Sequence, residues 1–198
     1  MKTKKIIFLG VAIVLMFSFI FPVGCAEEAV TPTTPTELKT YSKYGLSFEY
    51  PKRFTVTEMG MLENEATDAS GLVQVGVEND EVQIFQTAWV KMIQSTWEIS
   101  GDLQGVLKDS FAGMEGTEGI ASVNRGELIE STKAGHQMLY QYYNMTSTEG
   151  DTAYGIASVF YCDKSQKVFQ LLTINDTISA EQEVLEDFQN YLDSFVCH

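Results

Sequence analysis

An uncharged run near the N-terminus sets the first part of the chain apart from any folded domain. Three lysines within the first five residues precede 19 uncharged residues, Ile6–Gly24, which are rich in Leu, Ile, Val and Phe. A basic start, an apolar middle and a small-residue junction are the three parts of a secretory signal. The positive flank stays inside the cell, so residues 1–24 predict export of everything that follows.

Cys25 follows this segment directly and is the expected site of lipidation. The junction Val23-Gly24-Cys25 resembles a lipoprotein signal, in which a small residue precedes a cysteine that receives diacylglycerol. Pro22 departs from that pattern, because leucine usually stands there. Two acyl chains on one cysteine suffice for stable anchoring. The alternatives are an uncleaved anchor, since 19 uncharged residues can just span a bilayer, and plain secretion. We expect a lipid-anchored protein on the extracytoplasmic face of the cell membrane.

Residues 25–40 have the composition of a tether. This stretch contains Pro32, Pro35 and many threonines, and it shows no apolar periodicity. Such a composition is typical of an extended, semi-stiff linker. The folded domain is therefore expected over residues 41–198.

The charge of the exported part is strongly negative. The whole chain carries 13 basic and 27 acidic side chains and a formal net charge of −14. Removal of residues 1–24 takes three lysines and no acid, which leaves a charge of −17. A surface of this kind repels nucleic acid and anionic headgroups, so no nucleic-acid partner is expected. It keeps an exported domain soluble and attracts cations or basic partners.

Alternation of apolar and polar residues predicts a sheet of antiparallel strands. Leu46–Tyr50 and Phe54–Glu58 are expected to form a hairpin, with Pro51 ending the first strand because proline cannot donate to the ladder. Residues 91–100 are expected to form a loop, although their apolar residues also fit a helical spacing. Further strands are predicted over Gly71–Glu78, Val82–Lys91, Ala121–Ser131, Gln137–Met145, Thr152–Cys162 and Val168–Ile174.

Two helices are predicted between and after these strands. Asp102 is a suitable N-cap, and the residues that follow it repeat apolar side chains on one face. The second helix begins after Ser179, which forms a capping box with Gln182, and carries an apolar stripe from Val184 to Phe195. That stripe must be buried against the sheet. The order of elements indicates an α+β domain with helices covering an antiparallel sheet.

This order and spacing resemble the PsbP/DcrB-like superfamily over about residues 41–196. The matching features are the opening Tyr44–Pro51 with its hydrophobic partner strand, a helix before Gly135–Tyr140, a turn at Glu149–Asp151, the strand Val168–Leu172 and a final helix that closes at Asp193–Phe195. The resemblance implies a three-layer α/β/α sandwich around an antiparallel β-sheet. It also implies an accessory protein, because members include photosystem extrinsic subunits, a nuclear-import cofactor and envelope lipoproteins. The superfamily offers no shared catalytic residues, and a fold alone does not fix function.

Motifs of catalytic or cofactor chemistry are absent from the sequence. His136 and His198 are the only two histidines, and they match no zinc-ligand spacing. His136 follows a turn glycine and is expected to face solvent. The chain contains no GxSxG or SxxK nucleophile motif and no glycine-rich nucleotide loop. We expect no catalytic residues, no metal site and no cofactor.

Cys162 and Cys197 remain as a pair once Cys25 carries lipid. An even number of thiols outside the cytoplasm indicates a disulfide, which would pin the last helix to the sheet. A loop of this length predicts roughly 3–4 kcal/mol of stabilisation in the chain-entropy description. Two unpaired thiols in a reducing setting are the alternative.

Acidic turns and tyrosines are weaker signals of a binding site. Glu78–Glu81 and Glu149–Asp151 fall at turns, where Asn, Asp and Gly are common, and neither matches a calcium loop. Alternation puts Tyr140 and Tyr142 on one face of a strand and Tyr143 on the other. Packing in the core or on the sheet face is favoured over a ligand groove.

The sequence thus predicts a non-catalytic, membrane-anchored extracytoplasmic lipoprotein that is an accessory or docking subunit of an envelope or membrane complex. Its expected partners are the membrane, through the lipid anchor, and another envelope protein. The alternative is a small-molecule or cation-binding surface lipoprotein, which the acidic balance and the surplus of tyrosines favour.

Overall fold

Ten strands and three helices make up the described part of the chain. The computed structural model describes residues 37–61, 64–78, 82–176 and 181–198. The predicted signal, Cys25 and the Ser179 cap lie outside these residues. In chain order the elements are β1 (Leu38–Lys43), β2 (Leu46–Pro51), β3 (Thr55–Met59), β4 (Ser70–Glu78), β5 (Val82–Lys91), α1 (Gln94–Ser100), α2 (Leu103–Glu115), β6 (Ile120–Lys133), β7 (His136–Ser147), β8 (Thr152–Cys162), β9 (Lys167–Asn175), α3 (Glu181–Ser194) and β10 (Val196–Cys197).

Seven of the strands form one antiparallel sheet in the order β3-β4-β5-β9-β8-β7-β6. The remaining described strands form a small sheet in the order β1-β2-β10. β4 to β9 lie within a few residues of their predicted positions. The prediction of an α+β fold dominated by antiparallel strands is confirmed.

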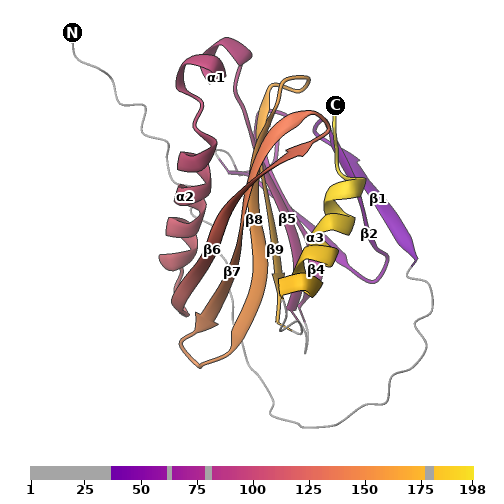
Figure 1. The fold of residues 1–198 in the computed structure, drawn as a ribbon. Coiled ribbons are helices and arrows are strands. Elements are labelled where there is room, and N and C mark those ends of the chain that lie inside the picture. Colours follow the sequence, from indigo (N-terminus) through magenta and orange to yellow (C-terminus); the bar gives the residue numbers. More distant parts are fainter. Residues whose placement is uncertain (1–36, 62–63, 79–81, 177–180) are drawn as a thin grey trace.

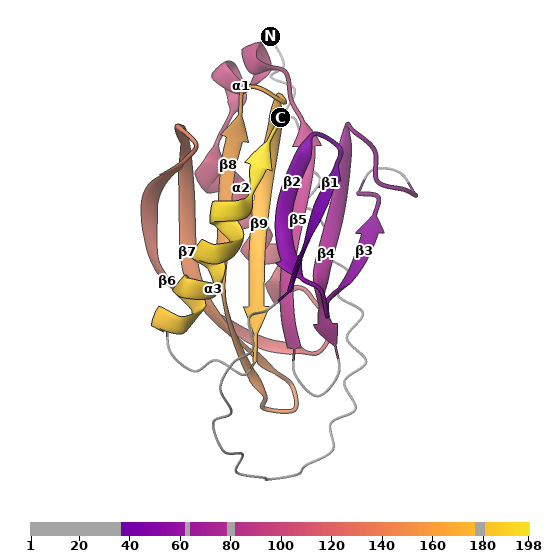
Figure 2. The same ribbon diagram turned by 90° about the vertical axis from the view of Figure 1, so that its right-hand side faces the viewer.

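Both faces of the main sheet are covered. Successive side chains of a strand point to opposite faces, so one strand contributes to two cores. In β9, Val168 and Leu172 pack with α2, whereas Phe169 and Leu171 pack with α3. Figure 1 shows α2 and α3 on opposite sides of the sheet. The small sheet lies beside α3 on the same face (Figure 2), so this covering layer is mixed rather than purely helical.

The expected hairpin between β2 and β3 is wrong. β2 pairs with β1 and β10, whereas β3 pairs with β4 at the edge of the main sheet. A tight turn, in which Phe54 N–H donates to Pro51 C=O at 2.9 Å, carries the chain from one sheet to the other. Alternation indicates which side chains face the core but not which strand lies alongside. β2 buries Leu46 and Phe48 in the α3-side core, and the half-buried Val56 of β3 packs against the same core.

Three further elements were not predicted. β1 begins at Leu38, inside the expected tether, and only Tyr41 of its six side chains is buried. β10 is two residues long. Both strands are held by backbone pairing with β2, which leaves no periodic side-chain signal. α1 occupies residues expected to be a loop, and its Trp97 packs against the α2-side core, which holds this helix of about two turns in place.

Gly155 in β8 leaves room for a buried tyrosine. Tyr143 lies opposite it in β7 and donates a 2.6 Å hydrogen bond to the Thr173 carbonyl. A Cβ at position 155 would lie 1.9 Å from that carbonyl oxygen and 2.6 Å from the Tyr143 ring. The crossing of the Tyr143 side chain over the backbone therefore requires glycine.

We predict that Gly155→Ala destabilises the domain by about 1–3 kcal/mol or more, because an extra methyl group in a tight core forces its neighbours apart. Urea unfolding would measure the change. Gly126→Ala in β6 is the matched control, since its Cβ would meet Tyr142 at an ordinary 3.5 Å and should change stability by no more than about 0.5 kcal/mol. Equal losses in the two variants would contradict this explanation.

Candidate functional site

Chemically active side chains gather at one end of the main sheet, called the α1 end here. At this end β5 and β8 finish, at Lys91 and Cys162, and β7 and β9 begin, at His136 and Lys167. Antiparallel pairing brings these strand ends side by side. Figure 1 shows α1 and the C-terminus at the same end of the molecule. The α1 end holds three features: an ion-pair network around one buried lysine, a disulfide with a histidine beside it, and a cleft.

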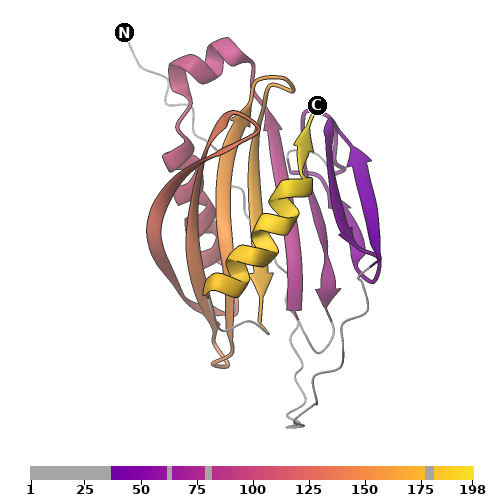
Figure 3. The same cartoon turned by 45° about the vertical axis from the view of Figure 1, so that its right-hand side comes forward.

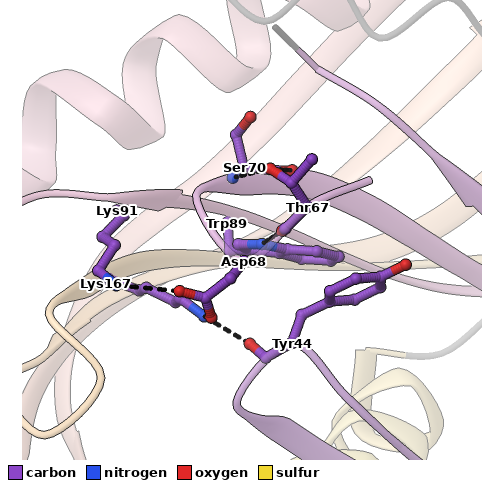
Figure 4. A network of polar contacts seen from close by, with 7 residues as sticks. All are labelled: Tyr44, Thr67, Asp68, Ser70, Trp89, Lys91 and Lys167. Atoms are coloured by element: carbon purple, nitrogen blue, oxygen red, sulfur yellow. Dashed lines mark hydrogen bonds and ion pairs between the residues drawn. The ribbon is translucent and has the colours of Figure 1, made fainter. Parts of the chain in front are cut away.

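The network centres on the ammonium group of Lys167, whose residue is only 1% exposed. Its Nζ donates to the Tyr44 carbonyl at 2.5 Å and to Asp68 Oδ1 at 2.6 Å. The other carboxylate oxygen of Asp68 accepts from Lys91 Nζ at 2.9 Å (Figure 4). Removal of a cation from water costs several kcal/mol unless it is paired and hydrogen-bonded. Lys167 therefore ties the main sheet to the loop before β4 and to the β1–β2 turn.

Aromatic packing strengthens the same junction. The Tyr44 ring stacks on Trp89 with 5.2 Å between centroids, and the Trp89 indole N–H donates to the Thr67 carbonyl at 2.9 Å. Figure 4 shows both rings beside the Asp68–Lys167 pair. The turn of the small sheet is thus held by charge, by hydrogen bonds and by ring contact together.

Two carboxylates in this region have lowered pKa values. The hydrogen bond from Lys167, followed by that from Lys91, holds the pKa of Asp68 below its usual range. Burial by itself would raise the pKa of Glu58, but hydrogen bonds from Lys43 and Tyr44 outweigh it and lower that pKa. Both carboxylates therefore stabilise the fold in their ionised form.

We predict that Asp68→Asn loses roughly 1–3 kcal/mol of unfolding free energy at pH 7, because the buried Lys167 loses its counter-charge. A lowered folded-state pKa gives stability that is present above the unfolded-state value, about 3.9, and is lost as the pH falls through the folded-state value. The difference between Asp68→Asn and the natural protein should therefore shrink below about pH 4. Denaturant unfolding at pH 7 and pH 3 would measure it.

Asp109→Asn, on the exposed face of α2, is the control and should change stability by no more than about 0.5 kcal/mol at either pH. A penalty for Asp68→Asn that is the same at pH 7 and pH 3 would show that the charge of Asp68 is not what stabilises the junction.

A disulfide joins Cys162 at the end of β8 to Cys197 in β10, with 6.6 Å between the Cα atoms. It lies at the margin of the α3-side core, where Cys162 is fully buried and Cys197 is 9% exposed. Of the two alternatives that the sequence leaves open for these cysteines, the structure has the bonded pair. The link fastens the C-terminal strand to the main sheet directly after α3.

His136 lies beside this disulfide instead of facing solvent as expected. Its side chain is only 12% exposed, and Nε2 lies 3.8 Å from Cys197 Sγ. On the other side of the ring, Nδ1 lies 3.7 Å from Asp163 Oδ1. His136 is the first residue of β7 and shares a strand face with the buried Met138, which turns the ring inward.

The cleft lies between α1, the start of α2 and the ends of β6, β7 and β8, and has a volume of about 570 Å³. Trp97 of α1 stacks on Tyr161 of β8 with 4.8 Å between centroids. The Tyr161 hydroxyl donates to the Met92 carbonyl at 3.0 Å, and burial raises the pKa of that hydroxyl. The lining residues are Trp97, Gly101, Asp102, Leu103, Gln104, Leu128, Glu130, Gly135, His136, Gln137, Leu139, Tyr161 and Asp163.

The cleft combines an aromatic wall with an acidic rim. Asp102, Glu130 and Asp163 supply three carboxylates, and Asp102 also caps α2 by accepting from the Gly105 N–H at 2.9 Å. This chemistry suits an occupant with apolar and basic groups. Sequence reasoning missed the cleft because its residues come from five elements.

The other candidates lie away from the α1 end or outside the described residues. The acidic turn Glu149–Asp151 joins β7 to β8 at the opposite end, where the Ser147 hydroxyl accepts from two of its backbone N–H groups. Tyr143 is buried on the α2 face, and Tyr140 and Tyr142 are half-buried on the α3 face, as alternation predicts. Asn79–Glu81 lie outside the described residues. None of the helices in the described ranges has the length and apolar character to cross a bilayer.

Comparison with known proteins identifies the architecture. No family model and no curated protein matches the sequence. Among solved structures, cyanobacterial PsbP (CyanoP) from Synechocystis sp. PCC 6803 is similar, with a TM-score of 0.57 at 15% identity over 86% of this chain and 98% of that chain. The domain has the PsbP-like fold. The resemblance inferred from the sequence is confirmed at the level of fold.

Two other solved structures match the PsbP-like domain with lower scores. The Ran-binding protein Mog1p of Saccharomyces cerevisiae has a TM-score of 0.48 at 9% identity, covering 82% of this chain and 96% of that one. LpqN, involved in cell envelope biogenesis of Mycobacterium tuberculosis, has a TM-score of 0.42 at 10% identity, covering 82% and 91%. At these scores nothing further is inferred from either protein.

The described chain enters the PsbP-like domain at the end opposite the α1 end. Leu38 pairs with Pro51 at the start of β1, whereas Lys43 pairs with Leu46 next to the Tyr44 turn. The Tyr44 carbonyl accepts from Lys167, which places that turn at the α1 end. Along β1 the entry point is about 17 Å away, at roughly 3.3 Å per residue. Figure 3 shows β1 beginning at the end of the molecule remote from α1.

Proposed function

We propose that this chain is a non-catalytic, membrane-anchored lipoprotein that docks through its α1 end onto another protein of the cell envelope or membrane. The observation that carries the proposal is that the first strand and the cleft lie at opposite ends of the domain. The segment that would connect Cys25 to the fold enters at one end, and the cleft lies at the other. A domain tethered in this way presents the cleft away from the membrane.

The proposed architecture is a three-layer α/β/α sandwich with an added small sheet. α2 forms one outer layer and α3 the other, and β1, β2 and β10 extend the α3 layer. The small sheet would then lie between the proposed tether and the α1 end. The turn of β1 and β2 is fixed to the main sheet by Lys167, so the first strand is held firmly against the rest of the domain.

The chemistry of the cleft indicates the kind of partner. Three carboxylates on its rim and the stacked pair of Trp97 and Tyr161 favour a partner segment with basic and apolar side chains. The charge of −17 that remains after removal of residues 1–24 adds long-range attraction for such a segment. Aromatic side chains in concave sites often dominate binding.

The absence of catalysis is part of the proposal. The strongest nucleophiles near His136 are the sulfurs of Cys162 and Cys197, and the disulfide occupies both. The arrangement around the cleft supports binding by shape and charge.

Cross-linking from the cleft rim tests the docking proposal. A photoreactive residue at Gln104 or Gln137, both exposed at the rim, should give one discrete cross-linked protein in intact cells. The same residue at Glu149, on the turn at the opposite end, should not. Trp97→Ala should weaken the complex by about 2 kcal/mol, roughly 30-fold, if Trp97 is an anchor.

Equal cross-linking from Gln104 and Glu149 would contradict docking through the α1 end. Native mass spectrometry of the extracted protein separates the alternative function, since a stoichiometric small-molecule or cation adduct without a protein partner would favour a binding lipoprotein.

Substitution of Cys25 tests the anchor. Cys25→Ser should move the domain from the membrane fraction to the soluble fraction, because the two acyl chains that hold it there are lost. The natural protein should have the mass of a chain that begins at Cys25 plus diacylglycerol. Cys162→Ser is the control and should stay with the membrane. Retention of Cys25→Ser at the membrane at full chain mass would indicate an uncleaved anchor instead.

A further inference from the structure

Three metal-ligating side chains meet at the α1 end from three strands. His136 begins β7, Cys162 ends β8 and Cys197 lies in β10, and one ligand atom from each lies within 4.8 Å of the others. In the oxidised protein the two sulfurs are bonded to each other. We infer that reduction of this disulfide converts the cluster into a Cys2His site for a thiophilic divalent cation such as Zn²⁺.

The positions of the ligand atoms suit such a cation. Zinc binds sulfur at about 2.3 Å and imidazole nitrogen at about 2.0–2.1 Å in tetrahedral geometry, which puts ligand atoms roughly 3.4–3.8 Å apart. His136 Nε2 already lies 3.8 Å from Cys197 Sγ. The remaining adjustment is a separation of the two sulfurs to non-bonded distance and a contraction of the longest edge, at most 4.8 Å, by up to roughly 1.0–1.4 Å.

The histidine is oriented as a metal ligand. Its Nε2 faces the sulfur, and its Nδ1 lies 3.7 Å from Asp163 Oδ1. A proton on Nδ1 directed at this carboxylate leaves the Nε2 lone pair for the cation. The Asp163 side chain is 59% exposed, so its rotation can close the roughly 0.5–1 Å that separates the two atoms from hydrogen-bond distance. Asp163 is thus a positioning residue for His136.

The surroundings allow Cys197 to move. Cys162 is fully buried and belongs to the main sheet, whereas Cys197 belongs to a two-residue strand at the edge of the small sheet. Cys197 and His136 both reach the surface, with 9% of Cys197 exposed. A water molecule can therefore supply the fourth position that a three-ligand site leaves open.

The conversion balances with a dithiol as the reductant. The dithiol supplies two electrons and two protons, the bond between Cys162 and Cys197 breaks, each sulfur gains a proton, and the two thiols of the reductant form their own disulfide. The cation then displaces both protons to solvent as two sulfur–metal bonds form. The disulfide and the metal are therefore mutually exclusive occupants of one position.

Cobalt titration of the full-length lipoprotein in mild detergent tests the inference. The protein is first treated with a chelator and then reduced with a water-soluble phosphine, which takes one oxygen atom from water as the disulfide gains two hydrogens. One Co²⁺ per chain should produce a thiolate-to-cobalt charge-transfer band and the intense visible bands of a tetrahedral site, and Zn²⁺ should remove both. The unreduced protein should show neither.

Variants separate this site from adventitious binding by thiols. Cys162→Ser should abolish the bands, and His136→Ala should weaken Co²⁺ binding at least about tenfold, since it removes one of three protein ligands. Asp163→Asn keeps all three ligands and should weaken binding by about 10–100-fold through the orientation of His136. His198→Ala should bind as the natural protein does.

Three results would each overturn the inference. One is equal Co²⁺ binding by His136→Ala and the natural protein. Another is equal binding by the oxidised and reduced protein. The last is a reduced protein without the cobalt bands, whether its circular dichroism spectrum remains native or collapses. Because the readout is spectroscopic and needs no partner, its failure leaves the docking proposal untouched.

Discussion

All nine residues of β9 are buried, and this requires cover on both faces of the main sheet. A strand places successive side chains on opposite faces, so Phe169 and Leu171 need one apolar layer and Val168 and Leu172 need another. α2 supplies the second of these. α3 is a single helix and leaves part of the first face uncovered, which β1 and β2 close with Tyr41, Leu46 and Phe48. The presence of a covering layer on each face of the main sheet is thus a consequence of the apolar composition of the central strands.

The same constraint explains why the α1 end is polar. Where the strands finish, buried positions meet chain turns whose backbone groups need partners. Lys167 occupies the first position of β9 and points into the α3-side core, yet its ammonium group reaches the Tyr44 carbonyl and Asp68 at the rim. Cys162 faces the same way one strand over, and its disulfide links the core to the last described strand. The charged and sulfur-containing side chains of the α1 end therefore lie where the two buried faces of the main sheet reach their edge.

Part of the fold and little of the site could be predicted from the sequence. β4, β5 and β7–β9 are largely apolar segments bounded by turn residues, and α2 has both its Asp102 cap and an apolar face, so local signals suffice there. β1 and β10 carry one buried side chain each and depend on backbone pairing with β2. Such strands show no periodic pattern of apolar side chains in the sequence. The predicted pairing of β2 with β3 was wrong for a related reason. Alternation indicates which side chains of a strand face the core, but it does not indicate which strand lies next to it.

What the sequence determined by itself is the periodicity of the strands and helices, the acidic charge, the export signature and the even pair of cysteines in the domain. All of these depend on residues close in the chain or on composition. Only the tertiary structure decided that His136 turns inward beside Cys197, that Asp68 pairs with Lys167, and that the cleft lies opposite the entry of β1. The paired side chains are separated by 61 and 99 positions in sequence, and contacts of that range exist only once the sheet order and register are fixed.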